Sequence, residues 1–143
     1  PWYTGDLPSS LLEPRVENLY DETSAQQGVG ISIWREPLPS DGYPATAPVG
    51  RFSANAFGLH DVLGNVAEYC IDGFNGSFYR NSPWLDPMQP WLYGSSYIEI
   101  RVARGGSWNS LPEHTARASF RHDVSLDGAF STHGVRPARP LDP

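Results

Sequence analysis

The chain has 143 residues, a formal net charge of −6 and a single cysteine, Cys70. One cysteine excludes an intrachain disulfide and any zinc site built from several cysteines. All ten basic residues are arginines and they form no basic cluster, so nucleic-acid binding is not expected. No apolar run is long enough to span a membrane, and the composition leaves the localisation open.

Loops and turns are expected to dominate the fold. Fourteen glycines and fourteen prolines favour tight turns, and the aromatic residues offer apolar surface to bury in one small domain. Short strands are expected, in chain order, at residues 29–34, 45–49, 66–71, 98–104, 116–121 and 134–139. The segment VAEYCI at 66–71 is mostly apolar, which predicts that this strand is buried. The aromatic stretch 74–97 predicts a long surface loop, and alternating apolar residues at 98–104 and 116–121 predict one buried face in each strand.

Six segments carry a recognisable pattern. They are PW at 1–2, DGYPATAPV at 41–49, NAFGLHDVLGNVAEYC at 55–70, RGGSW at 104–108, the arginine pair Arg117 and Arg121, and GVRPAR at 134–139. Together, and in this order, they resemble the formylglycine-generating-enzyme or sulfatase-modifying-factor family. The resemblance implies an α+β fold with little regular structure, similar to a C-type lectin, with short twisted antiparallel strands and long ordered loops.

The resemblance also bears on domain organisation. Domains of this family carry an N-terminal half before the segment that is found here at residues 1–2. We therefore expect residues 1–143 to be the C-terminal part of a single domain, with the N-terminal half, on the same or a separate chain, as its partner. Without that half, residues 1–143 are expected to expose apolar surface and to be poorly soluble.

Side chains are expected to replace backbone pairing in such a fold, because buried N–H and C=O groups need partners. Asn65, in the segment GLHDVLGN, is a candidate for bridging two loops. Arg117, Arg121 and Arg136 are candidates for buried donors to carbonyl groups.

The resemblance further implies two calcium sites with oxygen ligands, the kind that calcium prefers. The first site corresponds to Asn18, Leu19, Asp41 and Tyr43. The second corresponds to Asp61, which replaces an asparagine of the family, to the carbonyls of Gly64 and Val66, and to Glu68. From the residues alone, capping of turns is the simpler role for Asp41 and Asp61; with the resemblance, we expect at least one bound calcium.

The chain differs from the family at the positions of two catalytic cysteines. Formylglycine formation in the family uses two cysteines that bind copper(I), a soft ion that prefers thiolates. The matching positions hold Ser110 and Thr115, whose hydroxyls cannot replace thiolates, so this chemistry is expected to be absent. Two tryptophans of the family's peptide groove are Ala67 and Tyr69 here. Cys70 is expected to be a small buried residue rather than a nucleophile.

These observations favour a binding or scaffold module over an enzyme. The module is expected to be stabilised by calcium and to recognise a protein, a peptide or another ligand through residues 74–97 and 108–133. The residues expected on this recognition surface are Trp84, Trp91, Tyr93, Ser107, Trp108, Ser110 and His114.

Two alternatives remain open. One is an oxidoreductase with a non-haem metal whose ligands lie on the other half, because some relatives use histidine-bound iron for sulfoxide synthesis. No pair of the four histidines His60, His114, His122 and His133 has the i,i+4 spacing of a helical metal motif. The other is a diversified ligand-binding receptor with a variable stretch after RGGSW.

Overall fold

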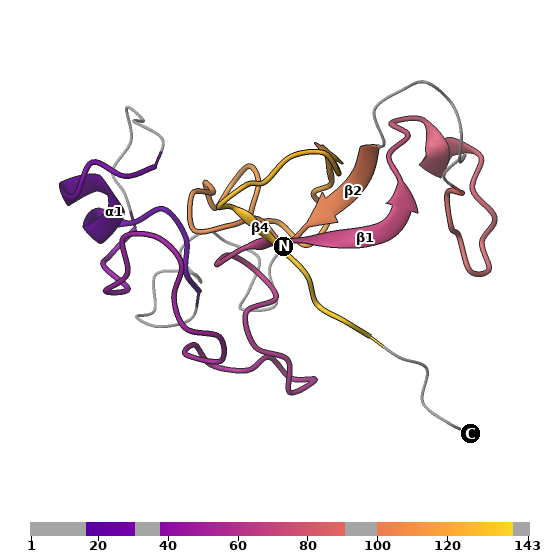
Figure 1. Ribbon diagram of the computed structural model, residues 1–143. Coiled ribbons are helices and arrows are strands. Elements are labelled where there is room, and N and C mark those ends of the chain that lie inside the picture. The colour runs from indigo at the N-terminus through magenta and orange to yellow at the C-terminus, as the bar shows by residue number, and fades with distance from the viewer. Residues whose placement is uncertain (1–16, 31–37, 91–99, 139–143) are drawn as a thin grey trace.

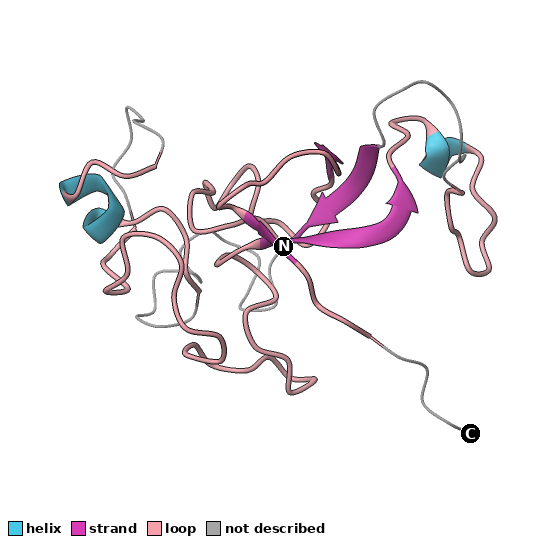
Figure 2. Ribbon diagram, viewed as in Figure 1, coloured by secondary structure: helices cyan, strands magenta, loops and turns pink. Residues whose placement is uncertain are grey.

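The computed structural model describes residues 17–30, 38–90 and 100–138, and most of these lie in loops (Figures 1 and 2). The regular elements of this part are few and short. They are α1 (Glu22–Gln26), β1 (Ala67–Gly73), the 3-10 helix η2 (Phe78–Arg80), β2 (Ile100–Arg104), β3 (His122–Ser125) and β4 (His133–Gly134). Figure 1 shows α1 at one end of the molecule and the loop that carries η2 at the other. The expected α+β architecture with little regular structure is confirmed.

The four strands form one mixed sheet in the order β3-β2-β1-β4. β1 pairs with β2 and β2 pairs with β3 in antiparallel fashion, whereas β4 runs parallel to β1. β3 and β4 are therefore the two edges of the sheet. Nevertheless, the Nε2 atoms of His122 on β3 and His133 on β4 are only 2.9 Å apart, so the sheet curls enough for side chains from its two edges to touch.

Small residues in the middle of the sheet make this curl possible. In the strand register, Tyr69 lies opposite Ala103, and Ala103 lies opposite His122. Ala67 lies opposite His133. Residues opposite one another share a face of the sheet, as do residues two apart on one strand. The two histidines thus reach toward each other over the buried methyl groups of Ala67 and Ala103.

Three of the expected strands are present in altered form. The strand expected at 66–71 is β1, but it is not buried along its length. Ala67 and Gly73 at its two ends are buried, whereas Ile71 is 71% exposed, where the register slips between Tyr69 and Gly73. The strand expected at 98–104 is β2 from residue 100 onward. Its expected alternation is wrong, since Val102 and Ala103 are both buried in this inner strand. The strand expected at 134–139 is reduced to β4.

Two expected strands are wrong. Residues 45–49 and 116–121 form bends, turns and irregular backbone. In the second stretch only Ala116 reaches the core, and turns such as the bond from Phe120 N–H to the Arg117 carbonyl replace strand pairing. The expected strand at 29–34 lies mostly outside the described residues. The expected surface loop at 74–97 is found over residues 74–90, where it holds only η2.

The apolar core of the described residues is small and divided. One cluster joins Leu19, Leu63 and Ala116, and the other joins Ala67, Ala103 and Val124. Such clusters bury little surface, so hydrogen bonds between loops must contribute much of the order.

Asn65 is the centre of those hydrogen bonds. Its amide group bonds to both the N–H and the carbonyl of Ala47, at 3.0 and 3.2 Å. Its backbone N–H donates to the Asn18 carbonyl, and its carbonyl accepts from Trp108 N–H. The side chain is 4% exposed, and its φ of 57° is one that asparagine tolerates better than most residues. The expected bridging role of Asn65 is confirmed, and it ties three segments together.

The arginines were expected to bridge loops from buried positions. The bridging is found for Arg136, which donates to the carbonyls of His60 and Asp61, whereas Arg117 donates to the His114 carbonyl within its own turn. The burial is wrong, because Arg117 and Arg136 are exposed and Arg121 is half-buried over the ring of Tyr79. A guanidinium can serve surface carbonyls while it keeps contact with water.

Gly64 allows two segments to approach closely, and its replacement is a test of the fold. It has φ 79°, and a Cβ there would lie 2.1 Å from the Asn18 carbonyl oxygen. Gly58 has nearly the same φ, 77°, but open space around it. We expect Gly64→Ala to destabilise the protein by at least about 2 kcal/mol more than Gly58→Ala, as measured by urea unfolding. Equal losses for the two variants would contradict the close approach of Gly64 to Asn18.

Candidate functional site

A pocket of about 370 Å³ lies between the turn at 106–111 and the histidines at the two sheet edges. Its polar side chains are Ser107, Asn109, Ser110, Thr115, His122, Thr132 and His133. Apolar walls come from Ala67, Leu111 and Phe120. None of the described residues that line it carries a formal charge at neutral pH when the histidines are neutral.

Ser110 and Thr115 come together at this pocket because the chain turns tightly at Gly106. A Cβ on Gly106 would lie 3.1 Å from both Ser110 Oγ and the Thr115 carbonyl oxygen. Ser110 Oγ accepts a hydrogen bond from Ser107 N–H at 2.9 Å, and Thr115 Oγ1 donates to the Leu111 carbonyl at 3.5 Å. Both hydroxyls are thus engaged in local hydrogen bonds within the segment 107–115.

The histidine pair forms the opposite wall. His122 Nε2 and His133 Nε2 are 2.9 Å apart, and Thr132 Oγ1 lies 3.1 Å from His133 Nδ1. Burial lowers the pKa of both histidines, and His122 lowers that of His133 further. The nearby Asp123 partly offsets the lowering at His122. Both rings are therefore expected to be neutral at neutral pH. No local sequence pattern pointed to this pair, because the two histidines are eleven positions apart and lie on different strands.

The residues expected on the recognition surface are divided by the structure. Ser107 and Ser110 line the pocket, whereas His114 is exposed outside its lining. Trp108 is buried, with its indole N–H donating to the Ser131 carbonyl at 3.3 Å, so it is a structural residue rather than a surface one. Trp84 is 92% exposed on the loop 74–90, which contributes nothing to the pocket lining. Trp91 and Tyr93 lie outside the described residues.

The first expected calcium position has two buried oxygens without a partner, Asn18 Oδ1 and Asp41 Oδ2. The other side-chain atoms of these residues are engaged: Asn18 Nδ2 donates to the Ala45 carbonyl at 2.8 Å, and Asp41 Oδ1 accepts from Tyr43 N–H at 2.7 Å. Asp41 N–H donates to the carboxylate of the buried Asp21 at 2.6 Å, which brings a second negative charge near. Buried oxygens left without a donor are what a cation would satisfy, so the residues fit the implied ion.

The second expected position fits less completely. Asp61 Oδ1 is buried without a partner, while Asp61 Oδ2 accepts from Gly50 N–H at 2.6 Å. Glu68, however, is already paired with Arg136, whose Nε lies 2.7 Å from Glu68 Oε1. Gly64 and Val66 lie between these two carboxylates in the sequence, on the turn that leads into β1. An ion here would share Glu68 with a guanidinium.

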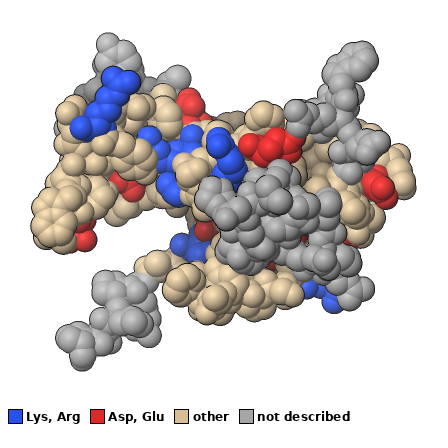
Figure 3. Space-filling model, turned by 180° about the vertical axis from the view of Figure 1, so that it is seen from behind, with Lys and Arg blue, Asp and Glu red and all other residues tan. Residues whose placement is uncertain are grey.

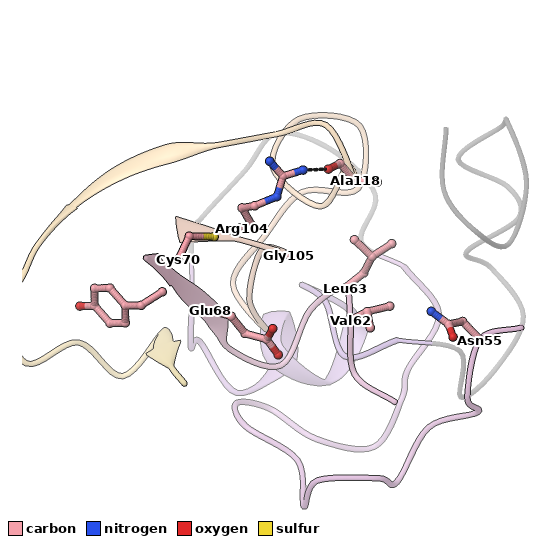
Figure 4. Close-up of a pocket in the computed structure, with 9 residues that line it drawn as sticks. Asn55, Val62, Leu63, Glu68, Cys70, Arg104, Gly105 and Ala118 are labelled. Carbon is pink, nitrogen blue, oxygen red and sulfur yellow. Dashed lines mark hydrogen bonds between the residues drawn. The ribbon is translucent and has the colours of Figure 1, made fainter. Parts of the chain in front are cut away.

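Cys70 lines a separate pocket of about 350 Å³, with Arg104, Leu63 and Asn55 among its walls (Figure 4). One guanidinium nitrogen of Arg104 donates to the Ala118 carbonyl. Burial raises the pKa of the Cys70 thiol, although the charge of Arg104 opposes this. The thiolate, which is the reactive form, is thus disfavoured.

Charges on the surface are mixed. Figure 3 shows arginine and carboxylate side chains close to one another in the middle of one face. Within the described residues, no three histidine, cysteine, aspartate or glutamate side chains are grouped as a metal site of that composition. None of the described helices has the length and apolar character needed to cross a membrane.

Comparison with known proteins agrees with the motifs. Residues 15–141 match the model of the sulfatase-modifying factor enzyme 1-like domain. The chain belongs to this family. It is 38% identical over 118 residues to the formylglycine-generating enzyme of Streptomyces coelicolor. This match covers 78% of the chain but only 36% of that enzyme.

The chain is also similar to a protein kinase and to a protein of known structure. A serine/threonine-protein kinase, Pkn1 of Chlamydia trachomatis, is 37% identical over 96 residues, which is 67% of the chain and 15% of the kinase. The solved structure of PvdO from Pseudomonas aeruginosa superimposes with a TM-score of 0.58 at 25% identity. That match covers 85% of the chain and 38% of PvdO. The chain thus spans well under half of each relative.

Proposed function

We propose that this chain is part of a calcium-stabilised, formylglycine-generating-enzyme-like binding module that does not carry out the copper chemistry of formylglycine formation. The observation that carries the proposal is the pocket at the positions of the family's cysteine pair. Its lining includes the hydroxyl groups of Ser110 and Thr115, at the two positions where the family resemblance implies thiolates. Copper(I) has little affinity for neutral hydroxyls, whereas such groups suit hydrogen bonding to a ligand.

The chemistry of the pocket suggests the class of ligand. Its uncharged lining offers hydroxyl, amide and imidazole groups on an otherwise apolar wall. A neutral segment of a peptide or protein, with a small apolar side chain and free backbone N–H and C=O groups, would match both features. The kinase relative supports a modular role, because the matching segment is a small part of a protein named for another activity.

Filling the pocket tests this proposal. Peptides selected from a random displayed library for binding to the protein are expected to lose at least about tenfold in affinity to Ser110→Trp, because the indole would occupy the space. Trp84→Ala, on the loop outside the pocket, is the control and should leave binding unchanged. Selected peptides that bind Ser110→Trp as tightly as the parent protein would contradict the proposal.

Calcium would hold the loops that frame this module. The support is the set of buried, unpartnered oxygens on Asn18, Asp41 and Asp61. Asn18 also accepts from the Asn65 backbone, and Asn65 in turn contacts Trp108, so an ion at Asn18 and Asp41 would stabilise the segment that leads into the pocket. The ion would serve as a structural link between loops and would take no part in a reaction.

Calcium binding is expected to depend on pH through Asp41. Burial, with a smaller contribution from Asp21, raises its pKa to about 7, although the bond from Tyr43 N–H opposes this. Calcium must displace the proton below that pH, so its affinity should rise by up to about tenfold per pH unit from about pH 5 to pH 7 and level off above. Calorimetric titration measures this. The same slope in Asp41→Asn would contradict the assignment.

The stability of the metal-free protein should change with pH in the opposite direction to the calcium affinity. A carboxyl group whose pKa is higher in the folded state than its usual 3.8 favours folding most when it is protonated. Metal-free stability should therefore fall as the pH rises from about 4 to about 7, and calcium should offset this loss.

The N-terminal half of the domain is the partner that we propose for the exposed apolar surface. Among the described residues, Val49, Phe57 and Val135 are each at least 78% exposed. Val49 and Val135 line one shallow depression beside His60 and Arg136. Apolar side chains gathered in this way favour a covering surface over contact with water.

A further inference from the structure

The histidine pair in the pocket has a geometry that calls for a specific role. The two Nε2 atoms are 2.9 Å apart and the ring centroids 5.2 Å apart. The difference is about twice the distance from an imidazole centre to its nitrogen, so the two nitrogens point straight at one another. Two neutral rings in this arrangement share one proton, with one Nε2–H donating to the other Nε2.

The surroundings hold both rings in place. Phe120 stacks on His122 at a centroid distance of 5.8 Å, and Phe130 and Tyr69 contact His133 at 5.2 and 5.6 Å. Thr132 Oγ1 lies within hydrogen-bonding distance of His133 Nδ1. An Nδ1–H that donates to this hydroxyl leaves Nε2 of His133 free to act as a ligand, and such outer contacts are typical of metal-binding histidines.

We propose that His122 and His133 form a two-imidazole site for a divalent first-row transition-metal ion, Zn(II), Cu(II) or Ni(II), whose remaining coordination positions open into the pocket. Two nitrogens at about 2.0–2.1 Å from one ion, with an angle of about 90–109° between them, lie about 2.8–3.4 Å apart. The observed separation is already at the lower end of this range. Binding requires the rings to tilt so that both Nε2 lone pairs converge. The ring that carried its proton on Nε2 must also change tautomer, with that proton moving to its own Nδ1, so both imidazoles stay neutral and no net proton is released.

The lining selects the class of ion. Imidazole nitrogen suits zinc, copper and nickel, whereas calcium and magnesium prefer oxygen. The described lining supplies neither a thiolate nor a carboxylate. The remaining ligands would be water, the nearby hydroxyls or a donor atom of a bound molecule. The family's two thiolates would select a soft ion, copper(I). This pocket instead has hydroxyls at those positions and imidazoles on the opposite wall, which suit an ion of borderline softness such as Zn(II).

The test is a calorimetric titration of the full-length protein with Zn(II), with calcium kept saturating so that oxygen sites do not contribute. We expect one equivalent of zinc to bind the parent protein and His114→Gln, whose histidine is exposed outside the pocket. His122→Gln and His133→Gln should each bind at least about tenfold more weakly. No zinc binding by the parent protein, or unchanged binding by both pocket variants, would overturn the proposal.

A second measurement on the parent protein keeps the test decisive if the variants unfold. Diethyl pyrocarbonate modifies accessible imidazoles, and mass spectrometry locates the sites. With zinc bound, His122 and His133 should be protected relative to the zinc-free protein, while His114 reacts equally in both. Equal modification of the pair with and without zinc would also overturn the proposal. Neither measurement involves a peptide ligand, so its outcome is independent of the proposed binding function.

Discussion

No formylglycine is expected to form when this protein is incubated with a sulfatase-type cysteine peptide, even when copper(I) is supplied. Oxidation of the peptide thiol in this family requires two thiolates that hold copper(I), and Ser110 and Thr115 occupy those positions. Ser110 Oγ instead accepts from Ser107 N–H, and Thr115 Oγ1 donates to a backbone carbonyl. Mass spectrometry of the peptide is the measurement. A product lighter than the thiol, formed over many turnovers, would contradict the expectation.

A reciprocal variant sharpens this experiment. The double substitution Ser110→Cys with Thr115→Cys should bind copper(I) at least about tenfold more tightly than the parent protein, because it restores a pair of soft ligands beside the same tight turn. Ser77→Cys with Thr23→Cys, which places two cysteines far apart in the sequence and away from the pocket, is the control. Equal copper(I) affinity of the two double variants would show that the pocket does not bring positions 110 and 115 together.

Removal of calcium is expected to lower the melting temperature by at least about 5 °C. A ligand that binds only the folded state adds about 2.7 kcal/mol at a hundred times its dissociation constant, and a small domain converts this into several degrees. The physical reason is that Asn18 Oδ1 and Asp41 Oδ2, which are buried without a hydrogen-bond partner in the described part of the chain, would lose the ion that we propose binds them. Differential scanning calorimetry with chelator and with millimolar calcium is the measurement, and identical melting curves would contradict the expectation.

Asp41→Asn separates the metal from the fold. Burial raises the pKa of the Asp41 carboxyl group to about 7, so its negative charge at pH 8 opposes folding of the metal-free protein. Removing this charge should therefore not lower the melting temperature of the metal-free protein at pH 8. With calcium present, the same variant should melt well below the parent protein. Asp86→Asn is the matched control on an exposed loop, and asparagine tolerates the positive φ of 46° at that position. Destabilisation of Asp41→Asn to the same extent with and without calcium would argue for a purely structural role.

The sequence motifs predicted those structural features that depend on neighbouring residues in the chain. Asn65 could be identified as a bridge because a fold with few strands needs side-chain amides to pair its loops. Its amide makes two bonds to Ala47, and its backbone makes two more, to Asn18 and Trp108. The strand beginning at Ala67 was also predictable, because an apolar run follows a glycine turn. The absence of a cysteine pair was directly readable from Ser110 and Thr115.

The remaining errors arise from long-range packing. Alternation at 116–121 suggested a strand, but turns at Arg117 and Phe120 use the backbone groups that a neighbouring strand would need. The pairing of His122 with His133 depends on the curl of the sheet over two alanines, and no local pattern encodes that curl. The burial of Trp108 likewise depends on a bond to Ser131, which a sequence pattern cannot place.

The proposed calcium site can be tested most directly with a crystal structure. The crystals would be grown in calcium, and diffraction would be recorded at a long wavelength, where the anomalous scattering of calcium is strong. We expect an anomalous peak within bonding distance of Asn18 Oδ1 and Asp41 Oδ2, and a weaker one at Asp61 Oδ1, where Glu68 is shared with Arg136. Ser110 and Thr115 should face the pocket without copper between them. Water or a direct hydrogen bond at Asn18 and Asp41, with no anomalous signal, would contradict the account.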